Sequence, residues 1–283
     1  MIASPLKYQG NKLKLMPSIL ELLPKKMTGF VDVFGGSGVV AANVAHARKC
    51  PVIYNEMDKI ISGIIMMLTR MPKLAFEQEV WRILRDYRIT DARCEEGYLK
   101  MVASANADVD NPNLLLLWVI SRHAHSNLLR MNLKGEVNIQ FGDRAISHRL
   151  GEVYAEADAF RSAMKNVKIE ALNYTELLTK IAPDVRKNDV LYFDPPYFAS
   201  GQFVYRCKWG IVEERRLLKN LTRCHELGFK FMLSNCTRHG PNLNMFLVKW
   251  MRDFNVHRLD SSYCLSNAYE DKSNTKEVIV TNY

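Results

Sequence analysis

The chain has 283 residues, with 39 Lys and Arg against 30 Asp and Glu, which gives a formal net charge of +9. This length can bury a substantial core, either as one large domain or as a catalytic domain carrying a smaller insert. No uninterrupted apolar run approaches the roughly 20 residues that span a bilayer, so we expect no membrane partner, while the basic surplus suits a polyanion without establishing one.

Cysteine usage and the N-terminus indicate a reducing compartment. The six cysteines form no C-x-x-C pair, and the first residues lack a charged segment followed by an apolar signal core. They are Cys50, Cys94, Cys207, Cys224, Cys236 and Cys264. We therefore expect a cytoplasmic protein.

The first part of the chain predicts a βαβ unit. Residues 30–34 are an apolar run stopped by Gly35 and Gly36, residues 39–46 have a helical pattern, and residues 52–54 are apolar again. From about residue 60 to residue 129 the apolar spacing is helical and no strand is convincing. This stretch is interpreted as a helical insert.

An alternating segment follows the helical stretch. Around Lys134-Gly135, residues 133–141 place apolar side chains on one face and amides on the other, which predicts a β-hairpin at about 132–142. The apolar positions are Val137, Ile139 and Phe141, and the amides are Asn138 and Gln140.

Strands return at 167–171, 190–193, 231–234 and 278–281, with helical segments between them. An α/β domain is therefore interrupted and then completed. We predict a catalytic domain from residues 1–59 and 150–283 and an insert at 60–149.

The strongest local pattern is Asp194-Pro195-Pro196-Tyr197, directly after the apolar run 189–193. One interpretation is a strand ended by prolines, with the tyrosine as ordinary packing. The other is chemical, because an exocyclic adenine amine is a poor nucleophile whose N–H groups need two held acceptors. The Asp194 carboxylate and the Pro195 carbonyl supply two, and Tyr197 offers a face for an extruded base. Cytosine ring-carbon methylation would need a cysteine after a proline, and the chain has no Pro-Cys dipeptide.

A glycine turn is the second pattern, at residues 30–38, and the segment Asn55-Glu56-Met57-Asp58 ends the next strand. Glycines there let a ligand approach the carboxyl edge of a parallel sheet, and Glu56 can accept hydrogen bonds from ribose hydroxyls. The turn is not a G-x-G-x-x-G, which favours adenosine recognition over NAD. Alternatively, Glu56 is a solvated acid at a helix start and Asp58 is an N-cap.

Four segments together resemble the Dam-type, D12-class adenine-N6 DNA methyltransferases. They are residues 5–12, residues 30–38 with 55–58, residues 127–132 with 134–142, and residues 194–197. The resemblance implies a Rossmann-like sheet with helices on both faces, a helical target-recognition insert bearing the hairpin, S-adenosyl-L-methionine (AdoMet) as cofactor and double-stranded DNA as substrate.

The resemblance also implies site residues by position. Glu56 stands where Asp is more usual, and Lys7, Lys12 and Lys14 have the alternative of an ordinary solvated face. The implied catalytic residues are Asp194, Pro195, Pro196 and Tyr197; the implied cofactor residues are Tyr8, Gly10, Lys12, Asp32, Phe34, Gly35, Gly36, Ser37, Gly38, Glu56, Asn173, Tyr174 and Asp194.

For DNA, the resemblance places Arg130 in the major groove against a guanine. Its alternative is a phosphate contact or a salt bridge. Lys7 reaches a second base, while Asn138 and Arg144 hold phosphates. Gln140 stands where GATC-specific members usually carry a proline, which leaves a GATC-like site or relaxed specificity open. The implied DNA-binding residues are Lys7, Ser126, Asn127, Leu128, Arg130, Asn132, Asn138, Gln140 and Arg144.

The prediction is a DNA adenine-N6 methyltransferase, from a restriction-modification or phage setting, in the cytoplasm and associated with the nucleoid. An RNA adenine methyltransferase and a non-catalytic DNA-binding protein on the same fold remain alternatives. His123 and His125 have no companions at a zinc-like spacing, so no metal is assigned. We expect no obligate protein partner, and a monomer or weak dimer.

Overall fold

The computed structural model describes residues 1–89, 94–142, 149–200, 209–259 and 275–283. In these ranges one sheet has the order β3-β2-β1-β4-β5-β8-β7, with β6 paired to β5. Strands β1 to β5 pair in parallel, and β8 is antiparallel to both β5 and β7. The strands are β1 (Phe30–Asp32), β2 (Val52–Asn55), β3 (Lys168–Glu170), β4 (Val190–Phe193), β5 (Lys230–His239), β6 (Asn242–Leu243), β7 (Asn255–Arg258) and β8 (Lys276–Thr281). This architecture confirms the predicted α/β class.

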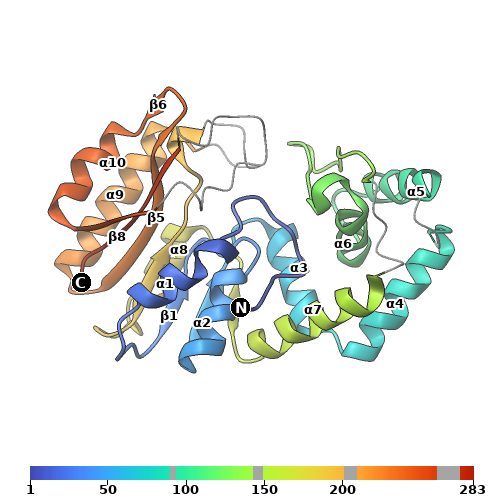
Figure 1. Ribbon diagram of the computed structural model, residues 1–283, viewed down its shortest axis with the longest axis horizontal. Helices are drawn as coiled ribbons and strands as arrows, with labels where there is room; N and C mark the ends of the chain where they lie inside the picture. The colour runs from blue at the N-terminus through green and yellow to red at the C-terminus, as the bar shows by residue number, and fades with distance from the viewer. Residues whose placement is uncertain (90–93, 143–148, 201–208, 260–274) are drawn as a thin grey trace.

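Helices cover both faces of the sheet, as Figure 1 shows with α9 and α10 on one side and α1 and α2 on the other. Alternate strand residues point to opposite faces, so Phe30 and Tyr192 belong to one apolar core, and Val31 and Leu191 to the other. Burial on both faces explains why the central strands are continuous apolar runs. The helices outside the predicted insert are α1 (Met16–Leu22), α2 (Val39–Arg48), α7 (Leu150–Met164), α8 (Tyr174–Ile181), α9 (Ile211–Glu226) and α10 (Met245–Trp250).

The predicted insert is helical in its described part. It contains α3 (Lys59–Arg70), α4 (Lys73–Asp86), α5 (Glu95–Asn106) and α6 (Leu114–His123), and Figure 1 shows α4, α5 and α6 beyond α3 and α7 as seen from the sheet. Ile64, Phe76 and Trp118 share one continuous core with Phe160 of α7 and with one face of the sheet. The Phe76 and Trp118 rings lie 5.1 Å apart. The division into two domains at residues 60–149 stays a prediction.

Residues 131–141 differ from a regular hairpin. Only isolated antiparallel bridges, Met131 with Val137 and Ala124 with Phe141, replace the expected ladder in this segment. The reason is competition from α5, where the Asn106 side chain bonds both the N–H and the C=O of Val137. Asn138 and Gln140 are nevertheless exposed while Val137 is buried, so the two faces alternate as the sequence indicates.

None of the helices in the described ranges has the length and apolar character needed to cross a membrane.

Candidate active site

The carboxyl ends of β1, β2 and β4 lie side by side, because these strands are neighbours in the parallel part of the sheet. A cavity of about 540 Å³ opens at this edge. Its lining includes most of the cofactor residues expected from the sequence: Tyr8, Gly10, Lys12, Phe34, Gly35, Gly36, Ser37, Glu56, Asn173, Tyr174 and Asp194, with Pro196 beside them. Five segments far apart in the chain therefore contribute to one site, as the motif order predicts.

The glycine turn is held against β2. The Gly35 N–H donates to the Asn55 carbonyl at 2.7 Å, and the Tyr54 hydroxyl donates to the Gly36 carbonyl at 2.7 Å. A Cβ on Gly35 would overlap the Tyr54 ring, and Gly36 has a φ of +48°. These two glycines are therefore required by close approach and by left-handed backbone geometry.

Glu56 faces the cavity and braces this turn. One carboxylate oxygen accepts from the Gly36 N–H at 3.0 Å and the other from the Asp58 N–H at 2.8 Å. Burial raises the pKa of Glu56 to about 7. Asp58 is the N-cap of α3, as the alternative interpretation held, but Glu56 is not a solvated acid.

Asp32 and Gly38 lie behind the cavity wall instead of lining it. Asp32 is buried and accepts a hydrogen bond from the Ala41 N–H at 3.2 Å, which caps the first turn of α2. Burial, with the charge of Asp194, raises the pKa of Asp32 well above its usual value. Gly38 is the N-cap of α2, with a φ of +74°. Both residues shape the turn.

Asp194 forms a buried ion pair at the end of β4. Its Oδ2 lies 2.7 Å from the Lys12 ammonium, which also donates to the Gly10 carbonyl at 2.8 Å and lies 5.1 Å from the centre of the Tyr197 ring. Burial raises the pKa of Asp194, and Lys12 and Tyr197 oppose that rise. The other oxygen, Oδ1, is buried and has no hydrogen-bond partner among the described residues. Lys12 is buried, so it does not belong to a solvated lysine face, whereas Lys14 is exposed.

Aromatic side chains form one end of the cavity. Phe34 lies 5.3 Å from Tyr174 and 5.8 Å from Trp209, measured between ring centroids. Asn173 caps α8 by accepting from the Thr175 N–H at 3.0 Å. Trp209 was not predicted, because it stands in no motif; an aromatic residue just before the helix-capping Gly210 is the only signal that could have indicated it.

Most residues expected to contact DNA lie on the segment that follows α6, residues 125–142, which we call the exposed segment after α6. Arg130, Asn138 and Gln140 are exposed, and no ion pair of Arg130 occurs in the described part of the chain. Ser126 and Asn127 both have positive φ, so they form a strained corner at the end of α6. Leu128 is half-buried at this corner, and Arg144 lies outside the described residues.

Asn132 has a structural position. Its Oδ1 accepts from the N–H groups of Lys134 and Glu136, at 2.9 and 3.0 Å, and its Nδ2 donates to the Glu136 carboxylate at 2.6 Å. The side chain therefore builds the turn itself, and its contact with DNA stays a prediction.

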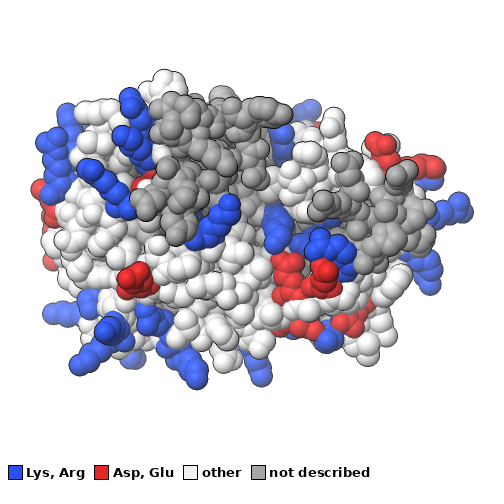
Figure 2. Space-filling model, viewed as in Figure 1, with Lys and Arg blue, Asp and Glu red and all other residues white. Residues whose placement is uncertain are grey.

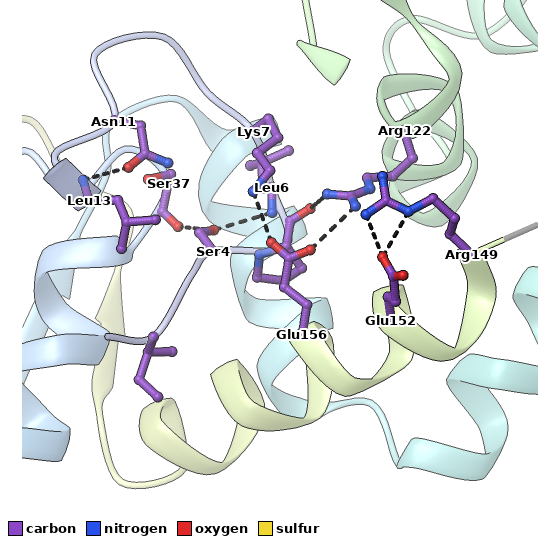
Figure 3. A network of polar contacts seen from close by, with 12 residues as sticks. Ser4, Leu6, Lys7, Asn11, Leu13, Ser37, Arg122, Arg149, Glu152 and Glu156 are labelled. Atoms are coloured by element: carbon purple, nitrogen blue, oxygen red, sulfur yellow. Dashed lines mark hydrogen bonds and ion pairs between the residues drawn. The ribbon is translucent and has the colours of Figure 1, made fainter. Parts of the chain in front are cut away.

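Lys7 is tied to the helical part of the chain. Figure 3 shows Glu156 of α7 between Lys7 and Arg122, at 3.0 Å from the first and 3.3 Å from the second. Arg122 and the indole of Trp118 also donate to the Pro5 carbonyl, at 3.2 and 3.1 Å. The lysine segment is thereby fastened to α6, the helix that leads into the exposed segment.

Charge is unevenly spread over the surface. Figure 2 shows a group of acidic side chains over α7, while Lys and Arg side chains project from the end of the molecule that holds the sheet. In the ranges that the structure describes, no three His, Cys, Asp or Glu side chains are grouped to hold a metal ion.

A doubly wound sheet with a glycine turn, an acidic residue after β2 and Asp-Pro-Pro-Tyr after β4 has the architecture that binds nucleotides at the carboxyl edge of its strands. The chain belongs to the D12 class N6 adenine-specific DNA methyltransferases, whose family model matches residues 8–264. Members of such a family take a methyl donor, so the resemblance inferred from the motifs is confirmed at this level.

Relatives agree with the family assignment. The chain is 29% identical to the modification methylase StsI of Streptococcus sanguinis over 299 residues, which cover 100% of this chain and 43% of that protein. It is 29% identical over 298 residues to the type II methyltransferase M.FokI of Planomicrobium okeanokoites, with the same coverage of both proteins. It is 27% identical over 195 residues to the DNA adenine methylase of Escherichia coli K12, covering 68% of this chain and 64% of that protein. The chain therefore spans less than half the length of the first two relatives.

Proposed function

We propose that this chain transfers a methyl group from AdoMet to the N6 amine of an adenine in double-stranded DNA. The observation that carries the proposal is the unpartnered, buried Oδ1 of Asp194, beside a cavity that also receives Glu56 and the glycine turn. An unsatisfied buried acceptor is costly and calls for a donor. An amine N–H is such a donor.

The residues present fit AdoMet. The cavity volume of about 540 Å³ is in the range of sites for drug-sized ligands. Glu56 can accept from ribose hydroxyls, and the end of the cavity formed by Phe34, Tyr174 and Trp209 suits a flat heteroaromatic ring. When bound, AdoMet would supply an electrophilic methyl group, whose bond to sulfur would break as the bond to nitrogen forms, leaving S-adenosylhomocysteine.

The residues around Asp194 would then prepare the amine. Lys12 pairs with Oδ2, which favours the ionised carboxylate despite burial and leaves Oδ1 for one amine N–H. The Pro195 carbonyl accepts the second N–H, and Tyr197 stacks on the extruded base. The carboxylate also stabilises the positive charge that develops on the amine nitrogen during transfer.

The finer parts of the proposal concern DNA recognition and setting. The exposed segment after α6 reads the duplex, with Arg130 at a guanine and Asn138 at a phosphate. The site is GATC-like or relaxed, because Gln140 departs from the GATC pattern. We further propose a cytoplasmic enzyme of a bacterial or phage-infected cell, at the nucleoid, in a restriction-modification or phage setting.

The test compares Asp194→Asn and Asp194→Ala with Asp184→Asn, which changes an exposed carboxylate after α8. Both Asp194 variants should lose turnover on duplex DNA by about 100- to 1000-fold, while DNA affinity stays close to that of the unmodified protein. Asp184→Asn should leave both unchanged. Labelled methyl transfer and gel shifts measure the two quantities, and circular dichroism checks folding. Normal turnover of folded Asp194→Asn would refute the assignment, and labelling of RNA alone would favour the RNA alternative.

A further inference from the structure

A buried carboxylate lies directly behind Trp209. Glu214, in the first turn of α9, is fully buried, and its Oε2 accepts from the Trp209 indole N–H at 2.8 Å. Its Oε1 accepts from the side-chain amides of Asn235 on β5, at 3.1 Å, and Asn244 at the start of α10, at 2.7 Å. Both asparagines are themselves fully buried. One carboxylate thus accepts hydrogen bonds from the segment before α9, from β5 and from the N-cap of α10.

These three N–H donors require a carboxylate at position 214. A glutamine at 214 would offer one acceptor oxygen and a donor amide, so one of the three N–H donors would face another donor. Among the described residues Glu214 has no cationic partner, and burial raises its pKa, an effect that its three donors oppose. Burying a carboxylate without a countercharge is strongly unfavourable. Such a carboxylate fixes the orientation of the side chains that donate hydrogen bonds to it.

The side chain whose geometry is fixed is Trp209. It is 7% exposed, lines the cavity, and stands nearly perpendicular to Phe34, at an interplanar angle of 82°. Tyr174 completes this end of the cavity at 6.3 Å from the indole. An indole N–H held by one carboxylate oxygen leaves the ring little freedom to rotate.

We propose that Glu214 is a positioning residue that fixes the Trp209 indole as the wall closing the adenine end of the cofactor cavity. The inference rests on the proposed function, because it takes the ring bound between Phe34, Tyr174 and Trp209 to be the adenine of AdoMet. Glu214 acts only through the indole, since the carboxylate does not line the cavity.

The same helix offers a matched control. Thr222, two turns further along α9, accepts a hydrogen bond from the indole N–H of Trp250 at 2.9 Å. Trp250 packs on Phe231 and Phe254 and does not line the cavity. Thr222→Val therefore removes a tryptophan acceptor from α9 without touching the proposed adenine wall.

The experiment measures binding of S-adenosylhomocysteine by isothermal titration calorimetry for the unmodified chain, Glu214→Gln, Trp209→Phe and Thr222→Val. Glu214→Gln and Trp209→Phe should each weaken binding by about ten-fold, equivalent to about 1.4 kcal/mol. The double variant should lose no more than Trp209→Phe alone, because both changes break one link. Thr222→Val should bind within about two-fold of the unmodified chain.

A kinetic measurement separates positioning from general structural support. Glu214→Gln should raise KM for AdoMet and leave KM for DNA and kcat at saturation unchanged. Should Glu214→Gln fail to fold, Trp209→Phe decides, since phenylalanine keeps a ring but has no N–H to hold. Unchanged affinity in folded Glu214→Gln or in Trp209→Phe would overturn this inference alone, as would equal losses in Thr222→Val. Absence of binding by the unmodified chain would overturn the proposed function and the inference with it.

Discussion

Glu156 forms ion pairs with two cations that differ in burial. Substituting Glu156 should therefore change the free energy of unfolding by a different amount than substituting either cation. The Glu156 carboxylate lies 3.0 Å from Lys7 and 3.3 Å from Arg122. The Lys7 side chain is 34% exposed, whereas the Arg122 side chain is only 10% exposed. Burial lowers the pKa of Arg122, and Glu156 opposes this effect. Loss of the carboxylate should therefore cost more free energy through the buried Arg122 charge than through the partly exposed Lys7 charge.

The magnitude follows from that difference. Breaking a buried pair by removing one partner costs about 3–5 kcal/mol, because a charge is left uncompensated. Arg122 still donates to the Pro5 carbonyl and Glu156 is partly exposed, so we expect about 2 kcal/mol for Glu156→Gln. Lys7→Met breaks a half-exposed pair and should cost less than about 1 kcal/mol. In Glu156→Gln/Arg122→Met the buried charge is absent, so part of the loss should be recovered.

Urea unfolding followed by circular dichroism measures these differences in free energy. Lys7→Met should also weaken binding to duplex DNA, whereas Glu156→Gln leaves that lysine available and should bind DNA at least as well as the unmodified chain. Equal destabilisation by Lys7→Met and Glu156→Gln would refute the reasoning from burial. A further loss of stability in the double variant, in place of recovery, would show that Arg122 matters through packing and not through its charge.

Three further outcomes are expected. A pKa raised to about 7 means that Glu56 binds its proton more tightly in the folded chain, so its stabilising contribution is present at low pH and is lost as pH rises through about 7. Glu56→Gln should reduce this loss of stability, as measured by thermal unfolding across pH. An unchanged dependence of stability on pH would contradict the prediction. Gly35→Ala should destabilise the chain by about 1–3 kcal/mol, because the added methyl overlaps the Tyr54 ring, and it should abolish S-adenosylhomocysteine binding in calorimetry. Normal binding would contradict the requirement for close packing of the glycine turn against Tyr54. Arg130→Ala should weaken discrimination at one guanine by about 1–3 kcal/mol in competition gel shifts, whereas an equal loss on all sequences would indicate a phosphate contact.

The fold followed from the sequence wherever burial was complete. Strand β4 was predicted with its observed bounds because both of its faces are covered, which makes its sequence uniformly apolar. Strand β7 was missed because Asn255, His257 and Arg258 are polar, and among the described strands β7 lies at the edge of the sheet, paired with β8. Around Val137 the expected strand ladder does not form, because the Asn106 side chain bonds the backbone of Val137 instead. Asn106 is 31 residues away, so the periodicity of the local sequence cannot indicate this contact.

The site divides in the same way. Glu56 and Asp194, whose roles we propose, stand beside strand ends that can be recognised in the local sequence. The proposed role of Glu214 depends on Asn235 of β5 and Asn244 at the start of α10, which its neighbouring sequence does not indicate. For Trp209, the capping Gly210 beside it is the one local signal. Asn132 shows a role that the motif did not indicate, since its side-chain groups bond within its own turn, while its contact with DNA stays a prediction.

The N-terminal segment explains why distant motifs can act together. Its Ser4 hydroxyl donates to the Ser37 carbonyl of the glycine turn, its Pro5 carbonyl accepts from two side chains of α6, and Lys12 pairs with Asp194. Within nine residues the chain thus contacts the proposed cofactor turn, the helix leading to the exposed segment and the proposed catalytic carboxylate. A shift of α6 cannot leave this segment in place without breaking buried hydrogen bonds, which cost about 1–3 kcal/mol each when a partner is lost. The position of the segment is therefore set jointly by the sheet edge and by the helical insert.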